Sequence, residues 1–346
     1  MSVYVIDPLV DDRWNGLIER HQLASAFQQR GWLEALVRTY GYKPCVLTST
    51  SVGRPLANGI VMCRVSSWIT GTRLVSLPFS DHCEPLISDR EDIHCFSDWL
   101  RAECDRQHWR YVELRTLLQV RNAIDGLCEN RAFCFHELDL RPSLERLFDG
   151  LHKDCLQRRI RKAEKESLAY EVGCSKQLAD DFYQLLLITR RRHQLLPQPR
   201  AWFRNLIDCM GDSVQIRLAR KNNTPVAAIL TLRHRSSVVY KYGCSDERFH
   251  NLGGMPFLFW KLIEESKAAG VLNIDLGRSD IDHHGLIVFK DRLGAARKLL
   301  TYYRYPKPAR EKRSDAWDSG VLRQLFSVLP AAVSSTAGRM VYKHVG

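Results

Sequence analysis

The sequence predicts a mixed α/β (α+β) protein built of two similar halves. Its 346 residues suit two domains of about 150 residues each. Hydrophobic residues make up 45% of the chain and charged residues 26%, which supplies enough apolar side chains for two cores. Both halves also show the same order of segments: helices, a meander of strands, a further helix and a further strand. This repeated order indicates a duplicated unit.

In the first half, the hydrophobic pattern predicts both kinds of element. Trp32, Leu33 and Leu36 recur at helical spacing within residues 29–40, and Gly41 ends this helix. Segments rich in Val, Ile and Leu predict strands, and residues 91–107 predict a second helix. The strands are expected at 43–49, 59–67, 73–77, 111–114 and 134–140.

The second half opens with a strongly basic helix over residues 154–166. Helical spacing separates its basic side chains from its apolar ones. The basic face holds Arg158, Arg161, Lys162 and Lys165, and the apolar face holds Leu156, Ile160 and Ala163. Further helices are expected at 177–192, around Trp202 and at 256–269, and strands at 168–172, 214–219, 226–233, 237–243, 273–276 and 299–305.

The N-terminal residues and the cysteines favour a cytoplasmic protein. Residues 1–8 lack the basic start and the apolar stretch of a signal peptide, and no run approaches the ~18 apolar residues of a spanning helix. Eleven cysteines without a Cys-x-x-Cys pair are unlike a secreted disulfide framework or a zinc site. His283 and His284 stand beside two aspartates, but neighbours on one loop seldom reach one ion together, so no metal is expected.

The charge balance favours anionic partners. Lys and Arg exceed Asp and Glu, which gives a formal net charge of +12. Such a surplus suits a phosphate-bearing cofactor, a nucleic acid or an anionic membrane face, and does not choose among them. The sequence has no Gly-x-Ser-x-Gly elbow, Walker loop, strand-placed dinucleotide fingerprint or His-Glu-x-x-His motif, so hydrolase, NTPase, dehydrogenase and zincin functions have no support.

A glycine pair marks a candidate phosphate site. The segment 240–245 ends a predicted strand, and the chain then turns through Gly253 and Gly254 into a helix with Pro256 in its first turn. Free N–H groups at a helix N-terminus, with the helix dipole behind them, bind phosphate readily. The alternative is that the two glycines only form the turn.

Several motifs together carry a family resemblance. They are Asp275-Leu276-Gly277-Arg278-Ser279, Phe289-Lys290 with Gly294, Thr189-x-x-Arg192 before Pro197, the basic residues 158–165 and, more weakly, Leu77-Pro78-Phe79-Ser80-Asp81. With these motifs the chain resembles the FemAB group of tandem GNAT-like acyltransferases. That group includes enzymes that add interpeptide-bridge amino acids to peptidoglycan precursors, and Gram-negative relatives described as carrying a BioF2-like acetyltransferase domain.

The resemblance implies an architecture. Two tandem GNAT-like domains are expected, each a mixed, largely antiparallel sheet flanked by helices. The first would span residues 1–150 and the second, with the active cleft, residues 151–305. The tail, residues 306–346, is expected to pack back on the first domain or to lie on the surface.

The resemblance also implies roles for particular residues. Lys290 would stabilise the oxyanion in the cleft, although a solvated helix lysine is the alternative. Asp81 would accept the proton of the attacking amine, although a turn-forming Asp is at least as plausible. Arg192 would clamp a phosphate or carboxylate, with a solvated helix face as the alternative. The remaining residues assigned to substrate binding are Arg278, Phe289 and Tyr242, and Gly253 and Gly254 are assigned to the cofactor.

The function implied is direct transfer of an acyl or aminoacyl group to an amine of a small molecule or a cell-envelope precursor. Acyl-CoA is the expected donor and aminoacyl-tRNA the alternative. Partners would be the envelope precursor, tRNA in the second case, and transiently the inner membrane surface; the oligomeric state stays open. Two other functions compete, namely a nucleic-acid-binding protein, which the basic helix would permit, and an inactive relative that only binds an envelope precursor.

Overall fold

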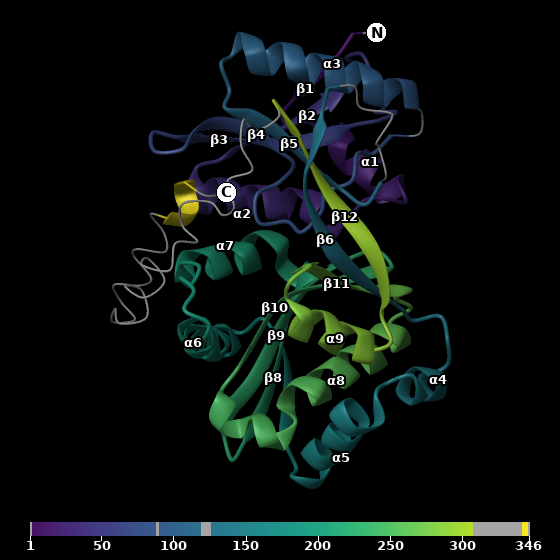
Figure 1. Ribbon diagram of the computed structural model, residues 1–346, viewed down its shortest axis with the longest axis vertical. Coiled ribbons are helices and arrows are strands. Elements are labelled where there is room, and N and C mark those ends of the chain that lie inside the picture. Colours follow the sequence, from purple (N-terminus) through teal and green to yellow (C-terminus); the bar gives the residue numbers. More distant parts are fainter. Residues whose placement is uncertain (1, 88–89, 119–125, 307–340, 345–346) are drawn as a thin grey trace. The chain divides into compact units, whose positions relative to one another are not determined.

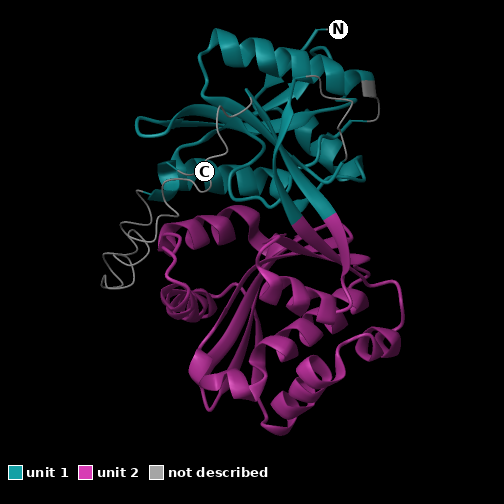
Figure 2. Ribbon diagram, in the orientation of Figure 1, with its two compact units in different colours: residues 1–133, 299–312, 339–346 teal, residues 134–298, 313–338 magenta. Residues whose placement is uncertain are grey.

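The computed structural model describes residues 2–87, 90–118, 126–306 and 341–344 (Figure 1). The chain divides into two compact units, which Figure 2 colours separately. Unit 1 comprises Met1–Phe133, Leu299–Lys312 and Arg339–Gly346, and unit 2 comprises Cys134–Lys298 and Arg313–Gly338. Strands β6 (Cys128–Asp139) and β12 (Ala296–Tyr305) each begin in one unit and end in the other. Neither unit is therefore one continuous stretch of chain.

In unit 1, the sheet has the order β1-β2-β3-β4-β5-β12. Its strands are β1 (Tyr4–Ile6), β2 (Lys43–Thr48), β3 (Ile60–Ser67), β4 (Gly71–Val75), β5 (Tyr111–Thr116) and the end of β12, and its helices are α1 (Arg13–Arg20), η1 (Ala26–Gln28), α2 (Arg30–Tyr40) and α3 (Arg90–Arg106). These strand pairs are antiparallel except β4–β5. That pair is parallel, and α3 connects its two strands. Helix α2 ends where the spacing predicts, because Gly41 adopts φ +71° and donates its N–H to the carbonyl of Val37.

A buried ion cluster ties β12 to β5 in unit 1. The two oxygens of the Glu113 carboxylate accept hydrogen bonds from Arg115 Nε at 3.0 Å and from Arg304 Nη2 at 2.8 Å. Burial opposes the charge of Glu113, but the two guanidinium groups outweigh burial and hold the pKa of this carboxyl below its usual value. The pairing thus compensates a charge that the core would otherwise exclude.

In unit 2, the sheet has the order β6-β11-β10-β9-β8-β7. The strands are β7 (Ala169–Gly173), β8 (Val214–Lys221), β9 (Thr224–His234), β10 (Ser237–Ser245) and β11 (Asn273–Asp280), together with the end of β6. The helical segments are α4 (Leu144–Asp149), η2 (Lys153–Gln157), α5 (Arg158–Lys165), α6 (Lys176–Arg192), α7 (Arg200–Met210), η3 (Gly211–Ser213), η4 (Glu247–Leu252), α8 (Gly254–Ala268) and α9 (His284–Arg292). Strands β7 to β10 form an antiparallel meander, and α8 then connects β10 in parallel to β11.

Helices α6 and α8 cover opposite faces of the unit 2 meander (Figure 1). Contacts of the strands with each helix show the two faces of this sheet. The thiol of Cys244 on β10 donates to the carbonyl of Phe182 on α6, whereas Gly254 at the start of α8 faces Ala227 on β9. Both faces of β9 are buried, which explains its nearly unbroken apolar sequence.

The parallel pair β10–β11 separates toward its carboxyl ends. Ser237–Val239 pair with Asn273–Asp275, and the pairing then stops, whereas β10 keeps its pairing with β9 as far as Ser245. The register of β10 with β9 shifts between Tyr240 and Tyr242. Strand β11 nevertheless continues to Asp280. Beyond these paired residues the two neighbouring strands no longer satisfy each other's backbone groups, and helix α8 begins beyond the end of β10.

The predicted fold class is confirmed, since each unit is a mixed, largely antiparallel sheet flanked by helices. The predicted domain limits at residues 150 and 305 stay a prediction. Of the predicted tail, residues 307–340 and 345–346 lie outside the described residues. Its described helical turn, residues 341–344, belongs to unit 1, where Arg73 Nη2 donates to the carbonyl of His344 at 2.8 Å. Among the described helices, none is both long and apolar enough to cross a membrane.

Candidate active site

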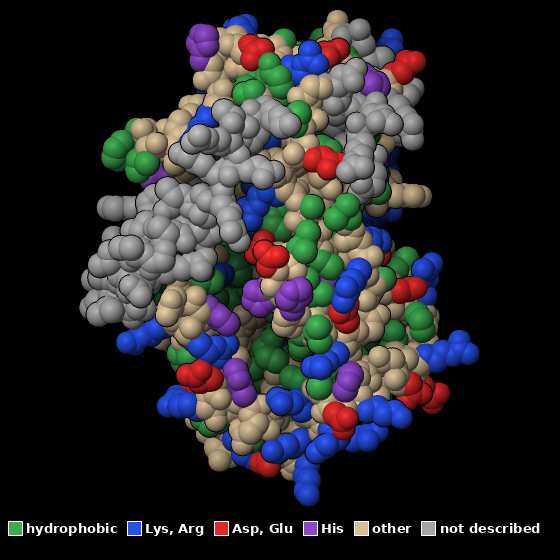
Figure 3. All heavy atoms as spheres, in the orientation of Figure 1, with side chains coloured by type: hydrophobic (Ala, Val, Ile, Leu, Met, Phe, Trp, Pro, Cys, Tyr) green, Lys and Arg blue, Asp and Glu red, His purple; other side chains and the backbone are tan. Residues whose placement is uncertain are grey.

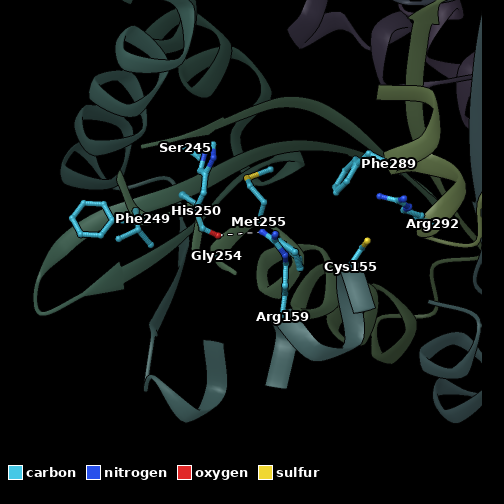
Figure 4. A pocket seen from close by; sticks show the side chains of 12 residues that line it. Cys155, Arg159, Ser245, Phe249, His250, Gly254, Met255, Phe289 and Arg292 are labelled. Atoms are coloured by element: carbon cyan, nitrogen blue, oxygen red, sulfur yellow. Dashed lines mark hydrogen bonds between the residues drawn. The ribbon is translucent and has the colours of Figure 1, made fainter. Parts of the chain in front are cut away.

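A pocket of about 350 Å³ lies at the N-terminus of α8 in unit 2 (Figure 4). It collects residues from η2, α5, β9, β10, η4, α8 and α9. The lining residues are Cys155, Arg159, Val226, Ala227, Ser245, Phe249, His250, Gly254, Met255, Pro256, Phe289 and Arg292. Apolar side chains thus combine with two guanidinium groups and one imidazole. Such a lining suits a ligand with both an anionic and an apolar part.

The glycine pair allows α8 to start tightly against its neighbours. Gly253 adopts φ +78°, and a Cβ atom there would lie 2.4 Å from the carbonyl oxygen of Arg159. A Cβ on Gly254 would lie 3.0 Å from the Cβ of Ala227. Glycine is therefore needed at the first position by both conformation and space. The pair forms the turn before α8, the second glycine also lines the pocket, and the assignment of both to the cofactor stays a prediction.

The start of α8 has the features of an anion site. Helical geometry leaves the first N–H groups of a helix without a partner in the helix, and Pro256 has no N–H, so Gly254 and Met255 supply the N–H groups of this turn. The positive end of the helix dipole points the same way. Arg159 and Arg292 add two positive charges to the lining. These features all favour a negatively charged group in the pocket.

The Thr189-x-x-Arg192 motif secures the end of β10 beside the pocket. The two residues lie one turn apart on α6. The hydroxyl of Thr189 accepts from the N–H of Ser245 at 2.9 Å and donates to its carbonyl at 3.1 Å. Arg192 Nη1 lies 3.5 Å from the same carbonyl and 3.1 Å from His250 Nε2. Arg192 therefore contacts two residues of the lining, although it is not itself part of it.

The contacts of His250 favour one protonation state. Its Nε2 atom lies 3.1 Å from Arg192 Nη1 and 2.9 Å from the hydroxyl oxygen of Ser245. A guanidinium group can only donate, so this geometry favours a neutral imidazole that accepts at Nε2. Burial lowers the pKa of His250, and the charges of Arg192 and Arg159 lower it further.

Lys290 and the Asp275–Ser279 motif form one structural unit at the end of β11. The Lys290 side chain is buried, and Nζ donates to the carbonyls of Gly277 at 2.9 Å and Arg278 at 3.0 Å. Gly277 adopts φ +71°, and its N–H donates to Asp275 Oδ1 at 2.6 Å. Phe289, the neighbour of Lys290, does line the pocket, where its ring centroid lies 5.5 Å from that of Phe259. Lys290 itself is not among the lining residues, and its role at an oxyanion stays a prediction.

The other predicted residues do not line this pocket. Tyr242 is buried, and its hydroxyl accepts a hydrogen bond from Trp202 Nε1 at 3.0 Å. Arg278 is half-buried and contributes a backbone carbonyl to Lys290. Asp81 belongs to unit 1, where its carbonyl accepts from the Tyr302 hydroxyl at 2.7 Å. The structure thus brings Gly254, Phe289 and Arg192 to one place.

The sequence interpretation missed Arg159 and His250. Arg159 stands one position after Arg158, about 100° around the helix and therefore off the basic face that the spacing singled out. His250 lies in the last turn of η4, three residues before Gly253, a position with no motif of its own. The sequence signal for His250 was its closeness to Gly253 and Gly254, because residues just before a helix N-terminus lie near an anion bound there.

The first of the two histidines after β11, His283, has a structural role. His283 is the N-cap of α9, and its Nδ1 accepts from the N–H of Leu286 at 3.2 Å. In the part of the chain that the structure describes, no group of three His, Cys, Asp or Glu side chains could hold a metal ion.

Comparison with known proteins agrees with this geometry. Residues 152–285 match the family model described as an acetyltransferase (GNAT) domain. No curated protein matches the chain in sequence.

Solved structures share the fold over most of the chain. The crystal structure of FemX is similar with a TM-score of 0.70 and 12% identity, over 87% of this chain and 97% of that one. The C-terminal domain of a putative lysylphosphatidylglycerol synthetase from Agrobacterium fabrum gives 0.55 and 17%, over 85% and 90%. A tandem GNAT protein from the clavulanic acid biosynthesis pathway gives 0.54 and 15%, over 91% and 100%. The resemblance to tandem GNAT proteins is thereby confirmed at the level of the fold.

Proposed function

We propose that the protein is an acyltransferase that binds an activated acyl donor, with acyl-CoA as the first choice, at the pocket before α8. One observation carries this proposal: the pocket combines the N-terminus of α8 with the guanidinium groups of Arg159 and Arg292. A pyrophosphate is recognised by such an arrangement, because N–H groups and guanidinium forks both donate to its oxygens. The GNAT match over residues 152–285 supports the same reaction class.

The separation of β10 from β11 supports an extended donor arm. Strand pairing between them stops after Val239 and Asp275, so backbone groups farther along both strands lack this partner. An arm with amide groups, such as pantetheine, could add its own N–H and C=O groups to such an edge, as peptides do in strand addition. The arm would carry the acyl group from the pocket along the sheet.

The proposed reaction is direct attack of an amine on the acyl carbon. Holding the amine and the acyl group together supplies much of the rate enhancement. Lys290 is the proposed oxyanion stabiliser, and its two bonds to the carbonyls of Gly277 and Arg278 support this role by fixing its ammonium group. Asp81 is proposed as the base. The acceptor would be an amine of a small molecule or envelope precursor, in a cytoplasmic protein that visits the inner membrane surface.

Thermal melts test the donor site. A saturating ligand stabilises the fold by RT ln(1 + [L]/Kd), or about 2.7 kcal/mol at a hundredfold excess over Kd. Acetyl-CoA should therefore raise the Tm of the wild type, and Arg159→Gln should weaken this shift. Arg158→Gln is the matched control, because its guanidinium lies on the exposed face and pairs with Asp154 at 3.3 Å. No shift at millimolar acetyl-CoA would reject this donor and favour aminoacyl-tRNA.

A second candidate function rests on the basic side chains of α5. Figure 3 shows Lys and Arg side chains gathered at the end of unit 2 that carries α4 and α5. Arg158, Arg161, Lys162 and Lys165 are all exposed there. A nucleic-acid-binding protein would lose affinity steeply as salt rises, roughly with the number of phosphates contacted. A shallow salt dependence of binding to a generic RNA would argue against this second candidate.

A further inference from the structure

His250 lies at the rim of the pocket. Beside the Arg192 guanidinium, its Nε2 atom can take part in the hydrogen-bond network as an acceptor. Arg192 comes from α6, Ser245 from the end of β10 and His250 from η4, and their polar atoms meet at His250 Nε2. Figure 4 shows Ser245 and His250 next to each other, with Arg159 directed toward the backbone oxygen of His250. In this state the imidazole accepts a hydrogen bond from an N–H of Arg192. A bound anion would compete for the same N–H.

Charged groups surround His250 from each neighbouring element. Arg192 approaches from α6, and Arg159 from α5 donates to the carbonyl of His250 at 3.3 Å. On its own segment stand Glu247 and Asp246, whose negative charges favour a protonated imidazole. Arg248 pairs with the Asp246 carboxylate at 2.6 Å and offsets that charge. The two guanidinium groups and burial outweigh the carboxylates, and the pKa of His250 is lowered.

We propose that His250 couples the binding of an anionic donor to the uptake of one proton. An incoming phosphate oxygen accepts the hydrogen bond from Arg192 that Nε2 accepts in the free protein. The released Nε2 atom takes a proton from solvent, and the resulting imidazolium donates to the anion. The step consists of one exchanged hydrogen bond and one added proton, without any covalent change. The proposal rests on the proposed function in that the anion is the donor's pyrophosphate.

The sign of the pH dependence follows from this exchange. The bound anion favours imidazolium, so the pKa of His250 is higher in the complex than in the free protein. Between these two pKa values, the complex binds one more proton than the free protein. Affinity should then rise as the pH falls, by up to about tenfold per pH unit, and should level off above the pKa of the complex.

Isothermal titration calorimetry with acetyl-dephospho-CoA tests the coupling. This probe keeps the pyrophosphate diester but lacks the phosphate monoester, which would itself titrate near neutral pH. Titrations in two non-phosphate buffers of different ionisation enthalpy, over a series of pH values from 5.5 to about 8, give the number of protons taken up. The wild type should take up close to one proton at the pH of steepest affinity change.

Two variants make the test specific. His250→Gln retains an acceptor for Arg192 but cannot be protonated, so it should bind the probe without proton uptake. His193→Gln is the control, because His193 Nε2 also lies near Arg192, at 3.4 Å from Nη2, yet is not in the lining. This control should keep the uptake. Absence of uptake in the wild type, or uptake retained in His250→Gln, would overturn the proposal while leaving the donor site intact.

Failure of the proposed function gives a different result. If acetyl-dephospho-CoA does not bind at any pH, the donor assignment is wrong, and sodium sulfate then serves as the probe of the anion site because it does not titrate in this range. Stabilisation of the wild type by sulfate should increase as the pH falls, and His250→Gln should remove this increase. Stabilisation independent of pH would overturn the proton coupling as well.

Discussion

Replacing Gly253 by alanine tests how α8 is seated against α5. Two effects add at this position. A left-handed φ of +78° costs an alanine roughly 1–2 kcal/mol. The new Cβ would also lie 2.4 Å from the carbonyl oxygen of Arg159, and forcing a methyl group into filled space costs roughly 1–3 kcal/mol. Their sum is about 2–5 kcal/mol, and in a unit of this size 1 kcal/mol shifts Tm by about 2–4 °C. The expected loss in Tm is therefore about 4–20 °C.

Gly270→Ala is the matched control for this variant. Gly270 has a similar φ of +71°, but a Cβ there would meet nothing within 4 Å. The Tm of Gly270→Ala should fall only by the amount that the left-handed backbone conformation costs, about 2–8 °C. Differential scanning calorimetry of both variants, with and without acetyl-CoA, measures the difference. Equal losses in the two variants would refute the steric argument, and a full acetyl-CoA shift in a well-folded Gly253→Ala protein would show that the seating of α8 does not matter for the ligand.

Three further predictions concern other parts of the chain. Lys290→Ala should lower kcat by at least about a hundredfold while donor binding changes little, since one good oxyanion donor is worth roughly 3 kcal/mol; near-normal turnover in steady-state kinetics would remove Lys290 from the mechanism. Glu113→Gln should destabilise the fold by about 3–5 kcal/mol because it removes the buried carboxylate that pairs with the half-buried guanidinium groups of Arg115 and Arg304. Glu19→Gln, at an exposed position of α1, should hardly change Tm, and equal melts for these two would contradict the buried-pair argument. Limited proteolysis with subtilisin should cut near residues 141–150 and release a stable fragment that begins there; cleavage mainly within 200–300 would speak against this domain junction.

The hydrophobic pattern was sufficient to predict most elements. The strands of the unit 2 meander and the ends of α2 and α8 agree with the predicted segments within a few residues. These elements carry their signals locally, as apolar runs and as terminal glycines such as Gly41 and Gly270. The motif Thr189-x-x-Arg192 was also informative, because i and i+3 share one face of a helix and both side chains reach the same strand end.

The other features of the fold and of the site depend on contacts that no local sequence pattern encodes. Strand β12 pairs with β5, so Thr301 lies opposite Thr116, and nothing in the spacing of either segment predicts this pairing. The partners of Lys290 are two backbone carbonyls, and backbone groups have no sequence signature. Arg159 is adjacent to the glycine turn because Gly253 leaves room for α5 to approach. Long-range pairings of this kind become visible only when the chain is folded.

The paths of β6 and β12 set the order in which this chain can fold during synthesis. The partner of β5 on one side, β12, is the last described strand to leave the ribosome, after all of unit 2 except its C-terminal segment. Until then β5 has an open edge, and open strand edges pair readily with other chains. Unit 1 therefore depends on protection from aggregation for longer than its early place in the sequence suggests. The antiparallel meander of unit 2 can form at once, because its paired strands follow one another closely in the sequence. In this protein the half that is translated first is completed last.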